Sequence, residues 1–412
     1  MRVTHRSLVV VVLAVAVVSV VGMALQWPSG GGLDEPPADF LPEADPQDAT
    51  LLSVTELVSD PDEPTMLPGA TIVEIDAELE ASGERITFDV TDETGDTYRA
   101  GQRVRVAEIP SADGDDRYYI SDFRRGAPLA VLGGMFVLAV LAFGRFQGLR
   151  ALAGLGITFA VIVGFIIPAI LGGENPVTVA LAGALAVMLV TLYLSHGVSA
   201  KTSAAVVGTA GALLLTVALA WGFTEAATLT GFTSEDARLA NFEVGGLSLR
   251  GLLLAGIIIG GLGVLDDVTM SQASTVFALR RANPGLPFSR LFAEGLSVGR
   301  DHVAATVNTL FLAYAGAALP LLILLTTGID PLPAVLTSEV VAVEVVRTLV
   351  GSVGLIAAVP LTTALAAAVV AAGDEPPPAD PPPVDEPAPW TSAARGEDHE
   401  EWIASLRSSR ER

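Results

Sequence analysis

Two adjacent aspartates lie inside one of the most apolar parts of the chain, in the segment GLGVLDDVTMSQAS from Gly261 to Ser274. An ionised carboxylate at the centre of a bilayer costs roughly 3 kcal/mol or more, so Asp266 and Asp267 need water, a cation or a proton. These residue types in this setting favour an ion or proton site. The alternative is a helix C-terminus at the inner membrane face, with both carboxylates in cytoplasmic water, although the helix dipole disfavours a carboxylate there.

Helical spacing separates the two aspartates. Small and polar residues recur at intervals of three or four and share one face of a helix. They are Gly256, Gly260, Gly263, Asp267, Ser271 and Ser274. Glycines at this spacing allow a neighbouring helix to approach closely. We therefore expect Asp267 to face the bundle interior as the functional carboxylate, with Asp266 about 100° away beside Met270.

The helix that carries these aspartates is bounded by arginines. About 29 residues separate Arg250 from Arg280, which is roughly 43 Å of straight helix and more than the hydrocarbon thickness of a bilayer. We expect either a strong tilt or a break at the GGLG sequence just before the aspartates.

Other polar residues occur in the last two apolar stretches. We expect Ser271 and Asn308 to line the path to Asp267. Glu344 and Arg347 are three residues apart, so they can pair within one helix, either as a structural ion pair or to set the local charge. His302 is expected at the membrane interface, and His196 in a loop.

The composition identifies a multi-pass membrane protein. Of 412 residues, 51% are hydrophobic and 17% charged, against about 25% charged in soluble domains. There is no cysteine, which excludes disulfides and thiolate chemistry. The net charge of −23 is concentrated in residues 34–122 and 374–401 and disfavours nucleic-acid binding.

Seven apolar stretches follow the first one, which begins after the basic sequence MRVTHR. We expect spans over about 128–144, 149–171, 176–195, 202–222, 247–270 or longer, 303–325 and 340–371. Arginine and lysine are enriched in alternate loops, which predicts eight spans with both termini cytoplasmic. Residues 286–300 have one apolar and one polar face and are expected to form a helix in the inner interface.

A soluble segment separates the first two spans. Between residues 50 and 125, five short stretches alternate apolar and polar residues and are separated by turn sequences such as SGE, TGD and DGDD. They predict a small extracytoplasmic β-barrel or OB-like domain.

The predicted fold is mainly α: a polytopic membrane bundle of about eight spans with a small β-domain after the first span. Its parts are an N-terminal signal anchor (1–27), a linker (28–49), the β-domain (50–125), a seven-span membrane core (126–372) and a disordered acidic, Pro-rich cytoplasmic tail (373–412).

Three segments resemble the YibE/F family of bacterial membrane proteins: GVLDDVTMSQAS, EGLSVGRDHVAATVNTLFLAYAGAALPLLILL and EVVAVEVVRTLVGSVGLIAAVPLTTALAA. The resemblance covers roughly 128–371 and implies a bacterial plasma-membrane protein with an outer β-domain. It matches Asp267, Met270, Ser271, Gly299, Arg300, Asp301, Asn308, Thr309, Ala313, Tyr314 and Gly316. Asp266, Thr269 and His302 depart from the family pattern. The family implies no substrate and no mechanism.

The leading hypothesis is a transporter or permease for an ion or small solute. The site would include Asp267, Asp266, Ser271, Asn308, Glu344 and Arg347, with Met270, Arg300, Asp301, Thr309 and Tyr314 as secondary candidates. The alternative is an envelope accessory or assembly protein whose β-domain binds a protein partner.

An intramembrane hydrolase is disfavoured, because two adjacent aspartates on one helix cannot face one scissile bond. A pair of Asp267 and Asp301 stays open. The chain has no G-x-S-x-G, H-E-x-x-H or P-loop motif, so active transport would be secondary or powered by a separate subunit. No cofactor is expected, and the sequence does not specify a metal.

Overall fold

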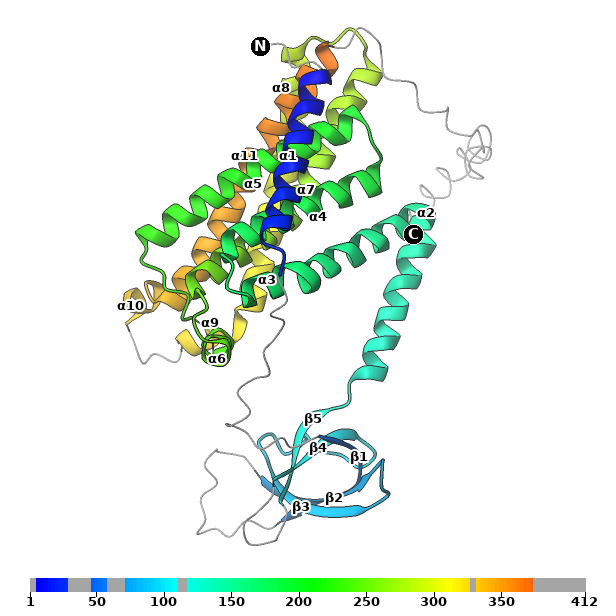
Figure 1. Cartoon of the computed structure of the whole chain (residues 1–412), viewed down its shortest axis with the longest axis vertical. Coiled ribbons are helices and arrows are strands. Elements are labelled where there is room, and N and C mark those ends of the chain that lie inside the picture. Colours follow the sequence, from blue (N-terminus) through cyan, green and yellow to red (C-terminus); the bar gives the residue numbers. More distant parts are fainter. Residues whose placement is uncertain are drawn as a thin grey trace, which may run out of the picture. The chain divides into compact units, whose positions relative to one another are not determined.

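The computed structural model describes residues 5–28, 46–57, 71–109, 117–233, 235–326 and 331–372. They form two compact units, the first containing most of the long helices and the second the β-sheet and the helices that follow it (Figure 1). The predicted tail over 373–412 and most of the predicted linker over 28–49 lie outside the described residues.

The first unit is a helical bundle. Its helices are α1 (His5–Leu25), α4 (Pro176–His196), α5 (Ala200–Ala226), α7 (Leu249–Ala282), α8 (Phe288–Ala317), α9 (Leu319–Thr326), α10 (Leu332–Leu336) and α11 (Glu339–Ala372). Helix α11 packs against both α5 and α8. The Ser19 hydroxyl of α1 donates a hydrogen bond to the carbonyl oxygen of Ala182 in α4 at 3.2 Å.

Within the described residues, six helices are long and apolar enough to cross a membrane, so the chain has the character of a membrane protein. They are Arg6–Leu25, Gly126–Leu171, Pro176–His196, Ala200–Ala226, Leu249–Ala282 and Glu339–Ala372. The second one, of 46 residues, comprises α2 (Gly126–Val161), the π-helix η1 (Ile162–Ile166) and α3 (Ile167–Leu171). Arg145 has non-helical dihedral angles, φ 48° and ψ −123°, and divides α2 where the two predicted spans meet.

Residues 286–300 differ from the expectation of a separate interfacial helix. They continue into the predicted seventh span as one 30-residue helix, α8. Leu291, Gly295 and Gly299 are buried in it. A Cβ atom at Gly295 would stand 3.0 Å from Thr363 of α11 and from Val276 of α7. This part of α8 therefore packs one face closely against α7 and α11, and its other residues are mostly exposed.

Helices α5 and α11 cross at very short range. A Cβ atom at Gly208 would overlap the Thr362 hydroxyl, and one at Gly354 would overlap the Thr216 hydroxyl. In contrast, no atom lies within 4 Å of a Cβ atom built on Gly256 or Gly263. A Cβ atom at Gly260, the third glycine of this α7 stripe, would stand 3.5 Å from the Tyr314 hydroxyl, which is ordinary contact. The closest helix approach therefore lies between α5 and α11 rather than along the glycines of α7.

Helix α7 runs without interruption through the GGLG sequence and both aspartates. Its 34 residues span about 51 Å. Of the two predicted alternatives, a strong tilt or a break near the aspartates, the continuous helix excludes the break. Tertiary packing of a long helix outweighs the low helix propensity of its glycines.

The second unit contains α6 (Glu235–Val244) and one antiparallel sheet of five strands, as the alternating pattern predicts. The strands are β1 (Gln47–Leu57), β2 (Thr71–Leu79), β3 (Arg85–Asp92), β4 (Arg103–Ile109) and β5 (Arg117–Phe123), in the order β3-β2-β1-β4-β5.

Register places apolar side chains of neighbouring strands side by side. Ile75 lies opposite Val54 of β1 and Phe88 of β3, and Ala49 lies opposite Val104 of β4. A bulge between Leu51 and Ser53 helps to curl the sheet. The result is a curled half-barrel around one apolar core, where the sequence predicted a β-barrel or OB-like domain.

Candidate functional site

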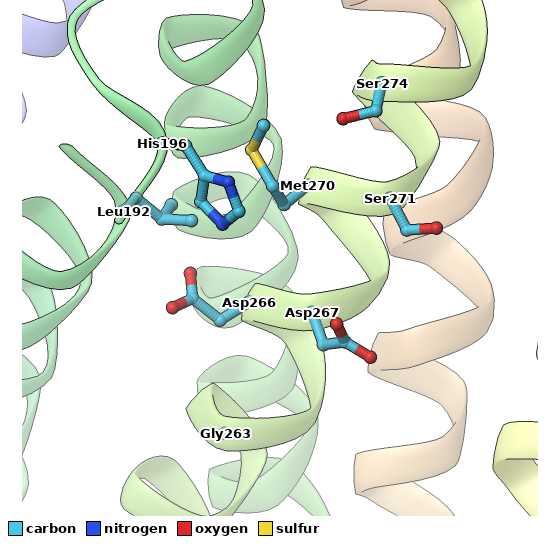
Figure 2. Close-up of a pocket in the computed structure, with 8 residues that line it drawn as sticks. All are labelled: Leu192, His196, Gly263, Asp266, Asp267, Met270, Ser271 and Ser274. Atoms are coloured by element: carbon cyan, nitrogen blue, oxygen red, sulfur yellow. The ribbon is translucent and has the colours of Figure 1, made fainter. Parts of the chain in front are cut away.

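A pocket of about 390 Å³ opens between α7 and the end of α4 (Figure 2). Helix α7 contributes most of its lining, and α4 contributes the rest. The lining residues are Leu192, His196, Gly263, Asp266, Asp267, Met270, Ser271 and Ser274. The pocket therefore brings together four predicted site residues: both aspartates, Met270 and Ser271.

Asp266 provides the more shielded carboxylate of the pocket. Its Oδ2 accepts one long hydrogen bond, 3.4 Å, from the Thr191 hydroxyl of α4. Its Oδ1 is buried and has no hydrogen-bond partner among the described residues. No arginine or lysine among the described residues forms an ion pair with Asp266. A buried, weakly bonded carboxylate is costly in its ionised form, so this position favours a bound cation or proton.

Asp267 differs from the expectation of an interior position. Its side chain is exposed and points to another side of α7 than the Asp266 carboxylate does (Figure 2). The buried face of α7 is formed by bulkier residues such as Ile258, Leu265 and Gln272. Since glycine has no side chain to bury, a bundle gains more by burying these residues than by burying the stripe that contains Asp267.

His196 is a pocket residue that sequence reasoning placed in a loop. It is the last residue of α4, and Gly197 follows with a φ of 75° that ends the helix. The exposed imidazole lies beside Met270 and next to the Asp266 carboxylate (Figure 2). It is also within electrostatic reach of Asp267 and Lys201. Its i,i+4 spacing from Leu192 is compatible with a shared helix face, but the sequence alone does not show that this face meets α7.

The predicted pair of Glu344 and Arg347 is confirmed. Arg347 Nη1 donates to Glu344 Oε1 at 2.7 Å, and both side chains are about 30% exposed. Glu344 and Tyr314 line a different, mainly apolar groove of about 220 Å³ between α8, α9 and α11. The ion pair is therefore not part of the Asp266 pocket.

The remaining candidates on α8 do not line the Asp266 pocket either. Arg300, Asp301, Asn308 and Thr309 are exposed. The Thr309 hydroxyl donates back to the carbonyl oxygen of Ala305 at 3.0 Å. Across the described ranges, no group of three or more histidines and acidic residues is arranged to hold a metal ion.

A buried polar seam beside the pocket was missed from the sequence. Gln272 Nε2 donates to the carbonyl oxygen of Gly295 at 2.6 Å and to the Thr363 hydroxyl at 2.7 Å. The hydroxyls of Thr209 and Thr269 lie 2.5 Å apart. These bonds connect α5, α7, α8 and α11 and fix the helix that carries Asp266. A glutamine inside an apolar helix was the available signal.

Comparison with known proteins yields one family. No curated protein and no solved structure matches the chain significantly. The family model of the YibE/F-like protein matches residues 132–372, which is more than half of the 412 residues. The matched region runs from within α2 to the last residue of α11 and contains the Asp266 pocket, the Glu344 groove and the polar seam. The chain therefore belongs to the YibE/F-like protein family.

Proposed function

We propose that this protein is a membrane transporter or permease for a small ion, with the Asp266 pocket as its ion site. The observation that supports this most strongly is the Asp266 carboxylate itself. One of its oxygens is buried without a hydrogen-bond partner among the described residues, on a helix apolar enough to cross a membrane. A carboxylate kept in such a place requires a compensating charge, which a transported cation or proton supplies.

The proposal includes eight spans in a bacterial plasma membrane, both termini in the cytoplasm and the β-domain outside. The distribution of arginine and lysine over the loops supports this orientation. Asp266 lies level with Thr191, five residues before α4 ends at His196. In this orientation the pocket opens toward the cytoplasmic end of the bundle. Asp267 and Ser271 stand on the exposed side of α7, where they attract the ion.

Substitution of the carboxylate tests the proposal. The full chain is reconstituted in vesicles, and fluxes of H⁺, Na⁺, K⁺ and Ca²⁺ are measured under an imposed potential. Asp266→Asn is expected to reduce the flux of the transported ion at least about tenfold, which corresponds to ~1.4 kcal/mol. Glu294→Gln makes the equivalent change at an exposed carboxylate of α8 outside the pocket and is expected to retain the flux. Equal fluxes in wild type and Asp266→Asn would contradict the proposal.

A second candidate function rests on the β-domain. The half-barrel contains its own pocket of about 400 Å³, and its lining includes Val54, Val73, Tyr98 and Arg99. This mixture of apolar, aromatic and charged groups suits a peptide segment of a partner protein in the cell envelope. If the protein is such an accessory factor, removal of residues 46–123 abolishes its cellular role, whereas Asp266→Asn leaves it intact.

A further inference from the structure

We propose that the ion of this site is a proton, and that His196 exchanges it between Asp266 and water. This inference rests on the proposed transport function and names its substrate. The two groups come from different helices, α4 and α7, and line the same pocket. In Figure 2 the imidazole of His196 and the carboxylate of Asp266 lie on the same side of α7.

The arrangement of oxygen atoms disfavours a metal cation. Hard cations such as Ca²⁺ and Mg²⁺ take about six or more oxygen ligands that converge from several directions. In the pocket, Asp266 and Asp267 point to different sides of α7 (Figure 2). The hydroxyls of Ser271 and Ser274 come from that same helix. A proton needs only one oxygen atom, and the buried Oδ1 of Asp266, which has no partner among the described residues, provides it.

Protonation of Asp266 also removes the free-energy cost of burying its negative charge. A neutral carboxyl group lacks the charge that makes burial near hydrocarbon costly. The Thr191 hydroxyl, 3.4 Å from Oδ2, is compatible with both states, because a carbonyl oxygen and a carboxylate oxygen both accept hydrogen bonds. Asp266 is therefore accommodated in its neutral form when no cation is near, and in its ionised form once a cationic partner is present.

His196 is suited to supply and remove this proton. Histidine titrates within the physiological pH range, and the C-terminal end of a helix stabilises the imidazolium form. The ionisable groups around it are Asp266 and Asp267 of α7 and Lys201 of α5. The Asp267 carboxylate favours imidazolium, whereas Lys201 opposes it. Tyr193, three residues before His196 in α4, is a further ionisable group, and its hydroxyl lies at hydrogen-bond distance, 2.9 Å, from the Ser203 hydroxyl.

The exchange step moves one proton and no electrons. The N–H bond of the His196 imidazolium breaks and an O–H bond forms on Asp266, directly or through one water molecule. An imidazolium and a carboxylate thereby become two neutral groups. His196 is exposed and recovers a proton from water, while the neutral Asp266 delivers its own to the opposite side during transport.

The test is infrared difference spectroscopy of the full chain in phosphatidylethanolamine–phosphatidylglycerol vesicles as pH is varied. A protonated-carboxyl band is expected that disappears in Asp266→Asn and persists in Asp267→Asn. In His196→Gln the band is retained, but its titration midpoint rises by about one pH unit, because the cation that favours the carboxylate is lost. His302→Gln, which changes a histidine outside the pocket, is expected to leave the midpoint unchanged.

An unchanged midpoint in His196→Gln, or a band that survives in Asp266→Asn, would overturn the inference. The flux experiment separates this failure from failure of the transport proposal. If Asp266→Asn abolishes a Na⁺ or K⁺ flux while no Asp266 band titrates, the transport proposal stands and the proton assignment is wrong. If neither a flux nor a titrating band depends on Asp266, both are wrong.

Discussion

Asp92 is a buried carboxylate at the end of β3 whose hydrogen bonds hold the turn that follows this strand. It is only 2% exposed. Its carboxylate accepts hydrogen bonds from the backbone N–H groups of Thr94, Gly95 and Thr97 and, at 2.6 Å, from the Thr97 hydroxyl. Burial opposes ionisation, but these bonds outweigh it, and the pKa of Asp92 lies below its usual range.

A lowered pKa in the folded state gives a pH dependence of known sign. The contribution of Asp92 to stability is complete above the unfolded-state pKa of about 3.9 and is lost as pH falls through the folded-state pKa. We expect Asp92→Ala to lower the free energy of opening of β3 by about 1–3 kcal/mol at neutral pH. Hydrogen exchange of β3 amides in the full chain measures this. Asp96→Ala, at an exposed aspartate of the same turn, should change little; equal effects of both substitutions would contradict the account.

At the scale of single elements, the crossing of α5 and α11 is the tightest contact described. We expect Gly354→Leu to disrupt it, because the new side chain would overlap Thr216 of α5. Overpacking of this kind costs typically 1–3 kcal/mol. Gly256→Leu is the matched control, since no described atom lies within 4 Å of its Cβ position. Thermal unfolding in detergent should show a lower midpoint for Gly354→Leu alone. A midpoint lowered equally by Gly256→Leu would contradict this packing.

The strands of the β-domain could be predicted from the sequence, whereas the buried side of α7 could not. The five strands were predictable because one face of each is buried, so apolar and polar residues alternate. The side of α7 that faces the bundle was not predictable. Apolar residues occur on every side of this helix, so its sequence has no apolar face to mark the buried side. The spacing of its glycines was the remaining pattern, and it favoured Asp267 rather than Asp266 as the interior carboxylate. His196 required knowledge of which helix lies next to α7, which follows from packing rather than from local sequence.

A similar ambiguity explains α8. Residues 286–300 alternate apolar and polar faces, which is typical both of an interfacial helix and of a helix that packs one face on a bundle. Gly295 and Gly299 decide between them, because their contacts with α7 and α11 become visible only in three dimensions. The helical pairing of Glu344 with Arg347 was predictable because it depends on spacing within one helix alone.

At the scale of the whole molecule, the chain combines a membrane-type helical bundle of the YibE/F-like protein family with a β-domain inserted between α1 and α2. The family region begins at residue 132 and excludes the sheet. The Asp266 pocket lies wholly within the family region, whereas the β-domain pocket lies wholly outside it. We therefore expect the proposed transport to depend on the bundle, and any partner-specific role to depend on the sheet.

We expect water to reach the pocket lined by Asp266 and Asp267 on α7 inside the membrane. The chain contains no cysteine, so single cysteines can be introduced along α7 and tested in intact membranes with a small polar thiol reagent. We predict labelling at Gly263 and Ser271, which line the pocket, and protection at Leu265 and Gln272, which are buried. Uniform protection would show that no water path exists. Uniform labelling from residue 266 onward would place the aspartates in the cytoplasm, and either result would contradict the account.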